Sequence, residues 1–306
     1  MPRLRLFGSF PNKCLSSISM SKFPNAKPIP LAFSEYVTAD TKADTESPVF
    51  IIHGLFGSRT NWNTVSKQIA ARTHRKVVAV DLRNHGDSPH TQEFSYNHMI
   101  ADLKQLMSEQ GIKEGRATIM GHSIGGRVAM ALALENPNSI RDLVIVDVSP
   151  LGFPPGVNFV PRLLKTLEEI KLKPGLTLTE ARKDAKEQMK KYIRGEKLRN
   201  FLGTNLILDE KSNKFAWKIN VQSLKENFSS LMTFPKFDNV FTRPCLFIAG
   251  EKSGYLKKED EGAIKHLFPN AGFEYVVGVG HLIHAEKPDL FLDIVTTFLK
   301  KNISIK

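Results

Sequence analysis

The chain has 306 residues, of which 41% are hydrophobic and 24% charged, so its composition is that of a folded protein with a sizeable core rather than of a disordered chain. No apolar run reaches the roughly 18 to 20 residues that cross a bilayer. Two cysteines are too few for a disulfide framework, and no cluster of Cys and His residues has the spacing of zinc ligands. The net charge of +12 comes mainly from residues 1–34 and 162–199, and the lack of interleaved basic and aromatic residues excludes nucleic-acid binding.

The first residues resemble a targeting signal more than a part of the fold. Residues 1–34 carry five basic residues and no acidic one, are rich in serine, and lack the long apolar stretch of a secretory signal. We predict a mitochondrial transit peptide over residues 1–28, cleaved between Ser9 and Lys27, and hence a mitochondrial protein. An untargeted tail is the alternative.

From Ile29 onward, short apolar runs alternate with amphipathic segments, which is typical of an α/β fold with a mostly parallel sheet flanked by helices. The predicted strands are continuous apolar runs, as strands buried on both faces require, at 49–53, 77–80, 117–121, 143–147, 245–250 and 273–277. The predicted helices lie between them at 60–71, 96–110, 124–135, 258–268 and 288–300.

This alternation stops at Pro150 and resumes near Pro244. The intervening segment is charged, helical in pattern and without a strand signal. We therefore expect a core formed by residues 29–150 and 241–306, and a helical cap over residues 151–240, inserted after the sixth strand of the sheet.

The motif GHSIG at 121–125 lies between a predicted strand and a predicted helix. A serine in such a strand-to-helix turn, called the elbow, is held in a strained backbone conformation with its hydroxyl exposed above the sheet. Small neighbouring residues allow the close approach of backbone segments that this turn requires. Ser123 is therefore the candidate nucleophile for attack on an acyl carbonyl. The alternative is a structural role in which the serine only caps the helix.

A serine nucleophile needs a base, and in this arrangement the base follows the last strand. His281 lies after a glycine-rich turn beyond the strand at 273–277, and His284 three residues later is the alternative. We favour His281, because its imidazole can reach back to Ser123.

The acid partner has two candidates. Related folds usually carry it after the strand that follows the cap, where this chain has Glu251 and places Ser253 at the usual aspartate position. Asp147 ends the preceding strand of the sequence, beside the strand that carries the elbow, and can hydrogen-bond the histidine and fix its tautomer. We favour Asp147 over Glu251.

Two backbone amides are expected to form the oxyanion hole. The first belongs to Ile124, which follows the nucleophile, and the second to Leu55 in the loop HGLFG after the first long apolar strand. This chemistry requires no metal ion and no organic cofactor.

With these residues in place, the chain resembles the abhydrolase domain-containing protein 11 family of α/β-hydrolase-fold enzymes. The resemblance spans the chain from about Ile29 to the C-terminus and rests on HGLFGS at 53–58, VDLRNHGDSPH at 80–90, GHSIGG at 121–126, VIVDVSP at 144–150 and the cap segments 198–205 and 215–220. It implies a catalytic triad at Ser123, Asp147 and His281, a structural role for Asp87, and a mitochondrial location. It also implies acyl ester or thioester substrates, including diacylglycerols for some members.

The prediction is therefore a serine esterase, lipase or thioesterase that works through an acyl-enzyme on a small-molecule acyl substrate. The first alternative is an alcohol acetyltransferase that uses acetyl-coenzyme A, as in the fungal branch of the family, and the second is a non-catalytic binding protein on the same fold. The basic segment 162–199 allows peripheral contact with an anionic membrane, although such a run is more often a solvated helix face.

Overall fold

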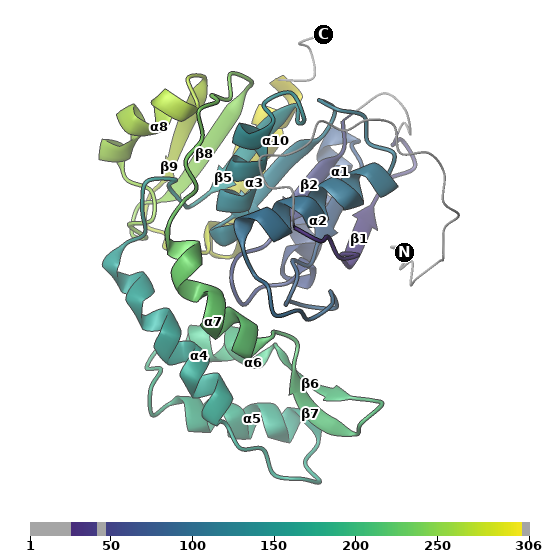
Figure 1. Ribbon diagram of the computed structural model, residues 1–306, viewed down its shortest axis with the longest axis vertical. Helices are drawn as coiled ribbons and strands as arrows, with labels where there is room; N and C mark the ends of the chain where they lie inside the picture. The colour runs from purple at the N-terminus through teal and green to yellow at the C-terminus, as the bar shows by residue number, and fades with distance from the viewer. Residues whose placement is uncertain (1–25, 42–46, 302–306) are drawn as a thin grey trace.

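The computed structural model describes residues 26–41 and 47–301 (Figure 1). Most of the predicted transit peptide, 1–28, lies outside the described residues. Near its end, the carbonyl of Lys27 accepts a hydrogen bond of 3.2 Å from the buried Arg83, and just beyond it the amide of Ile29 donates one of 2.8 Å to Asp102. The domain thus begins slightly before Ile29.

The central sheet has seven strands among the described residues, in the spatial order β1-β3-β2-β4-β5-β8-β9. Only the edge strand β1 runs antiparallel to its neighbour, and the other pairs are parallel. The bounds are β1 Phe33–Tyr36, β2 Val49–Ile52, β3 Val77–Val80, β4 Thr118–His122, β5 Asp142–Val146, β8 Cys245–Gly250 and β9 Ala271–Val276. The predicted strands all form; β1 was missed, because FSEY alternates polar and apolar residues at a half-buried edge.

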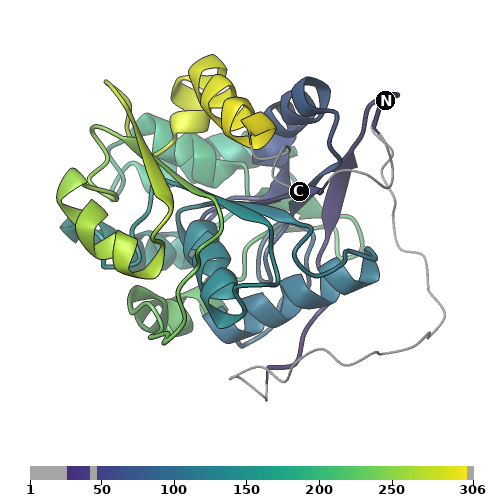
Figure 2. The same cartoon turned by 90° about the horizontal axis from the view of Figure 1, so that it is seen from above.

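Helices cover both faces of this sheet (Figure 2). Strand side chains alternate between two clusters: Phe50 and Ile52 of β2 pack on the side of α2 and α3, and Val49 and Ile51 pack on the side of α1 and α10. The bounds are α1 Asn63–Thr73, α2 Tyr96–Glu109, α3 Ile124–Glu135, α8 Glu261–Leu267, α9 Ile283–Glu286 and α10 Pro288–Lys301, with short 3₁₀ helices at Arg59–Trp62 and Lys258–Asp260. The predicted α/β-hydrolase fold is confirmed.

The segment between β5 and β8 forms a lobe beside the carboxyl ends of the strands, below the sheet in Figure 1, and is here called the cap (residues 151–240). It contains a 3₁₀ helix Pro155–Phe159, the helices α4 Val160–Glu169, α5 Leu178–Met189, α6 Glu196–Gly203 and α7 Val221–Met232, and the strands β6 Leu206–Asp209 and β7 Lys214–Trp217. No helix of the described residues is long and apolar enough to span a membrane.

Two features of the cap differ from expectation. β6 and β7 pair as an antiparallel hairpin, although the sequence showed no strand signal there. Each strand has only four residues and is partly exposed, so neither forms the continuous apolar run of a buried strand. The cap also follows β5, the fifth strand in chain order among the described residues, and not the sixth. Only one antiparallel strand, β1, comes before the parallel strands in the chain.

Candidate active site

Ser123 lies in a sharp turn between β4 and α3, with φ 55° and ψ −122°. A positive φ is uncommon for a residue with a side chain, so the surrounding backbone must impose it. Glycines make this possible: a Cβ on Gly121 would lie 2.3 Å from the carbonyl oxygen of Gly125, and one on Gly125 would lie 2.5 Å from that of His53. The turn is thereby pressed against β2, and Ser123 lies in the wall of a cavity.

Asp147 directly follows β5 and is fully buried, and its carboxylate meets His281. Its Oδ2 lies 2.6 Å from Nδ1 of His281, while Oδ1 accepts hydrogen bonds from the amide of Gly250 at 2.9 Å and the hydroxyl of Ser253 at 2.7 Å. A carboxylate on Nδ1 keeps the proton on that nitrogen and leaves Nε2 as the basic atom.

The structure therefore joins Asp147 and His281 by a hydrogen bond and places His281 and Ser123 in the wall of the same cavity. Among the described residues no hydrogen bond links the Ser123 hydroxyl to His281. Such bonds are often long in ligand-free enzymes and tighten around the substrate.

Neither alternative residue makes the contact between Asp147 and His281, although His284 also lines the cavity of Ser123. Glu251 is exposed and accepts a hydrogen bond of 2.8 Å from the amide of Gly278, with no contact to His281 among those described. His284 is buried and stacks on Trp62 at 4.0 Å between ring centroids. Burial, followed by the charge of nearby His281, lowers the pKa of His284 to about 3, so this imidazole is neutral.

Two further residues fix the ring and backbone of His281, and neither stood out in the sequence. Tyr255 stacks on the imidazole with 3.9 Å between centroids and 19° between planes. His122, inside the GHSIG motif, has Nε2 2.9 Å from the carbonyl oxygen of His281. Since a neutral imidazole can donate only through a protonated nitrogen, this bond places the proton of His122 on Nε2.

The predicted oxyanion residues come from two loops that meet at the elbow. Ile124 begins α3, so its amide has no partner within the helix. Leu55 lies in a turn closed by a 3.0 Å bond from the amide of Gly57 to the carbonyl of Gly54. Neither Leu55 nor Ile124 has an amide hydrogen bond among the described residues, so both amides remain available to an anionic oxygen.

Two buried neutral histidines support the loop of Leu55. His53 donates from Nδ1 to the carbonyl of Gly54 at 2.8 Å and accepts the amide of Leu82 at 3.0 Å. His85 accepts the amide of Phe56 at 3.3 Å. Burial lowers the pKa of His53 to about 4 and that of His85 to about 3, which keeps both rings able to accept. His53, which precedes the elbow, thus organises the loop.

The cavity above Ser123 has a volume of about 190 Å³ and is lined mainly by apolar side chains from the elbow, the oxyanion loop and the cap. The cap contributes residues of its entrance and of α4, α6 and α7, namely Phe153, Val157, Phe159, Val160, Leu163, Leu198, Phe201, Phe228, Leu231 and Met232. Trp217 lies in β7 of the cap and is not part of this lining. The described residues contain no group of three or more His, Cys, Asp or Glu side chains that could hold a metal ion.

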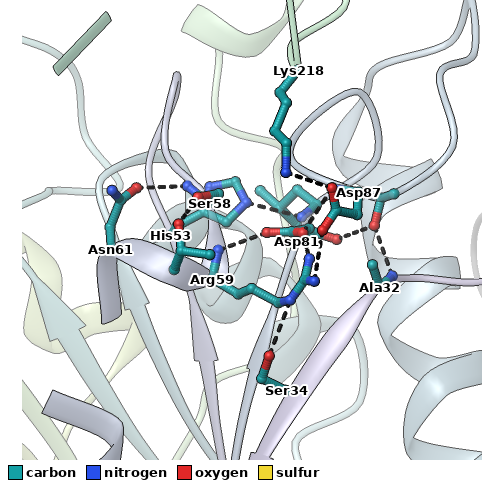
Figure 3. Close-up of polar contacts among 12 residues, drawn as sticks. Ala32, Ser34, His53, Ser58, Arg59, Asn61, Asp81, Asp87 and Lys218 are labelled. Carbon is teal, nitrogen blue, oxygen red and sulfur yellow. Dashed lines mark hydrogen bonds and ion pairs between the residues drawn. The ribbon is translucent and has the colours of Figure 1, made fainter. Parts of the chain in front are cut away.

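The RNHGDSP segment forms a polar junction between the core and the cap (Figure 3). The Arg59 guanidinium pairs with the buried carboxylate of Asp81 and, at 2.7 Å, with Asp87, which also binds Lys218 of the cap at 2.6 Å. Partial burial raises the pKa of Asp87, but the bonds from Lys218 and Arg59 outweigh it and hold that pKa below its ordinary value. Asp87 therefore has a structural position, away from Ser123.

This fold and this site define the class of the protein. A parallel sheet with a serine elbow after one strand, an Asp–His pair at the ends of later strands and a cap over the pocket is the arrangement of a capped α/β hydrolase. In agreement, residues 49–294 match the model of the family described as alpha/beta hydrolase family.

Comparison with individual relatives shows to which family within the α/β hydrolases the chain belongs. The chain is 36% identical over 275 residues to the sn-1-specific diacylglycerol lipase ABHD11 of Danio rerio, covering 90% of this chain and 84% of the relative. It is 31% identical over 304 residues to a probable alcohol acetyltransferase of Saccharomyces cerevisiae, covering 93% and 88%. A solved marine microorganism esterase superposes with a TM-score of 0.80 at 30% identity, covering 88% of this chain and 99% of that one. The chain belongs to the alpha/beta hydrolase family and, within it, to the abhydrolase domain-containing protein 11 family.

Proposed function

We propose that the protein is a serine esterase that cleaves carboxylic esters with an apolar acyl group. The observation that carries this proposal is the 2.6 Å bond between Asp147 and His281 in the same cavity as the strained elbow serine. An elbow serine without a histidine poised by a carboxylate would be only a helix cap. Names of lipases and esterases among the relatives support the same reaction class.

The proposed reaction has two steps. Ser123 attacks the ester carbonyl while Nε2 of His281 takes its proton, and Asp147 stabilises the imidazolium that results. The amides of Leu55 and Ile124 donate to the oxyanion, and collapse of the tetrahedral intermediate releases the alcohol, which receives the proton from His281. Water then attacks the acyl-enzyme by the same route and restores the free serine.

The cavity supports an acyl chain rather than a polar substituent as the buried part of the substrate. Its walls above Ser123 are aliphatic and aromatic, and each buried methylene contributes roughly 0.8 kcal/mol. Diacylglycerol fits this chemistry and is what the name of the Danio rerio relative states for that protein. Thioesters present the same carbonyl to Ser123, and a lipid substrate would bring the basic cap segment 162–199 near a membrane surface.

The test is hydrolysis of p-nitrophenyl esters from acetyl to dodecanoyl by the full chain and by Ser123→Ala, together with the intact mass of each protein. Turnover and an acyl adduct, both lost in Ser123→Ala, are expected. A second series of reactions with added ethanol measures ethyl ester formation, because an acetyltransferase transfers the acyl group of the same acyl-enzyme to an alcohol instead of to water. Absence of both turnover and adduct on every chain length would leave only a binding protein.

We also propose a mitochondrial location on the composition of residues 1–28, which are basic, serine-rich and free of acidic residues. Fusing these residues to a fluorescent protein tests this directly. Mitochondrial import is expected, and a diffuse signal would contradict the proposal.

A further inference from the structure

The turn that presents the amide of Leu55 contains a strained residue. Gly54 and Gly57 close the turn, and Phe56 at its third position has φ 64°. Turns with a positive φ at that position normally place glycine there, and a residue with a side chain keeps such a conformation only when its surroundings impose it. The two peptides on either side of Phe56 therefore depend on outside partners for their orientation.

Two hydrogen bonds hold Phe56, one from the core and one from the cap. Its amide donates to Nε2 of His85 at 3.3 Å, within the core. Its carbonyl accepts from Nδ2 of Asn205 at 2.9 Å, in a buried bond between residues 149 positions apart. The cap thus contacts the backbone of the residue that follows Leu55.

Asn205 is well suited to fix a backbone group. It lies between α6 and β6, where its amide donates to the carbonyl of Leu202 at 3.0 Å and its own carbonyl accepts the amide of Lys218 at 2.8 Å. Only 4% of Asn205 is exposed. Its backbone is therefore tied to both α6 and the end of the hairpin, so the side-chain amide has one defined position.

We propose that Asn205 is a positioning residue for the oxyanion hole, supplied by the cap, so that the hole is correctly formed only when the cap is docked on the core. The inference rests on the proposed esterase function, in which Leu55 donates to the oxyanion. Without the Asn205 bond, the carbonyl of Phe56 loses its partner from the cap, and the strained backbone at Phe56 can relax. The neighbouring Leu55 amide is then free to turn away from the reacting oxygen.

The same element of the cap, α6, also lines the cavity above Ser123. Leu198 and Phe201 of α6 line the cavity, two turns and one turn before Asn205. An acyl chain that reaches them packs against α6 and stabilises its docked position. Part of the binding energy of a long chain is then expressed as a faster chemical step, rather than only as tighter binding.

The experiment compares Asn205→Ala with Asn227→Ala in the full chain. Asn227 provides a matched control, because it is also a cap residue whose Nδ2 donates to a core carbonyl, that of Gln92 at 2.8 Å. This bond lies away from the turn at residues 54–57. We expect kcat on a dodecanoyl ester to fall by about 10- to 100-fold in Asn205→Ala, less than for loss of an oxyanion donor itself, with KM changed by less than about threefold. The kcat advantage of dodecanoyl over acetyl esters should shrink in the same variant.

A second measurement does not depend on turnover. Hydrogen exchange of the segment 53–58 should be faster in Asn205→Ala than in the wild type and Asn227→Ala. Equal kcat values for the two variants, or a loss confined to KM, or unchanged exchange of this segment, would each overturn the role of Asn205. If the wild type itself hydrolyses no ester, the proposed function fails, and the exchange data still decide whether Asn205 holds the turn.

Discussion

The hydroxyl of Ser253 donates a 2.7 Å hydrogen bond to Oδ1 of Asp147. Asp147 follows β5 and Ser253 follows β8, and these strands are neighbours in the sheet. Both strand ends therefore face the same point beside His281. The carboxylate that related folds carry after the later strand is here on the earlier one, and the serine left at the later position supports it.

Asp147→Asn should remove most of the activity while the fold remains. An asparagine cannot hold the His281 proton on Nδ1 with the same charge, so the base is lost as well as the stabilisation of the imidazolium. We expect kcat/KM on a p-nitrophenyl ester to fall by about 10³- to 10⁴-fold. Glu251→Gln is the control, and a loss of similar size there would show that the acid has been misassigned.

The double variant Asp147→Asn with Ser253→Asp tests whether the acid can move between the two strands. A carboxylate at 253 starts from a position whose hydroxyl already lies 2.7 Å from the Asp147 carboxylate. We expect it to recover at least about tenfold in kcat/KM over Asp147→Asn alone, because the Coulombic partner of the imidazolium returns. Ser253→Asp in the wild-type background should instead be less active than wild type, since two like charges would adjoin. Steady-state kinetics of the four proteins give the comparison.

Gly125→Ala should destabilise the protein, because its Cβ would lie 2.5 Å from the carbonyl oxygen of His53 and neither backbone can yield easily. We expect a loss of about 2 to 4 kcal/mol in the free energy of unfolding, measured by urea denaturation. Gly262→Ala is the matched control within α8, where a Cβ meets nothing within 4 Å and should stabilise by about 0.5 to 1 kcal/mol. Equal stabilities for the two variants would contradict the tight packing of the elbow.

Much of the fold could be predicted from the sequence because its signals are local. The runs VFII, VVAV and LVIV are apolar at consecutive positions and form β2, β3 and β5, and the predicted helix at 124–135 has the bounds of α3. The placement of Ser123 and Asp147 directly after their strands, and of His281 in the loop after β9, follows from chain order, since parallel strands bring their carboxyl ends to one edge.

The supporting contacts could not be predicted in this way, because they join residues far apart in the chain. Asn205 meets Phe56 across 149 positions, and Ser253 meets Asp147 across 106. An asparagine after a helix and a serine in a loop carry no local signal for such partners. The empty aspartate position at Ser253 was visible in the sequence, but its hydrogen bond to the acid depends on the pairing of β5 with β8.

Leu163→Trp should shorten the acyl chains that the enzyme prefers. Leu163 lies on α4 in the cavity wall and is buried, so an indole at this position fills space that the chain of a long ester would occupy. We expect the ratio of kcat/KM for dodecanoyl over acetyl esters to fall by at least about tenfold, equivalent to about two methylene groups. Leu208→Trp, at an exposed position of β6 in the same cap, should leave the ratio within about twofold. A matching fall in both variants would assign the effect to the cap as a whole.

His284 should make the protein less stable as the pH falls. Its folded-state pKa is about 3, whereas an unfolded chain takes up this proton near pH 6.5. Between these values the unfolded state binds more protons than the folded state, so the free energy of unfolding falls as the pH is lowered through this window. From pH 7 to pH 5 the contribution of this one group is about 2 kcal/mol.

His284→Phe removes the imidazole that takes up this proton and keeps a flat aromatic ring against Trp62. Nδ1 of His284 has no hydrogen-bond partner among the described residues, so the replacement sacrifices no bond of that atom. We expect urea denaturation to show about 2 kcal/mol less loss of stability between pH 7 and pH 5 than in the wild type. The same change at His266, which is exposed on α8, supplies the control. A pH dependence as steep in His284→Phe as in the wild type would contradict this, because His284 would then take up its proton over the same pH range in the folded and the unfolded protein.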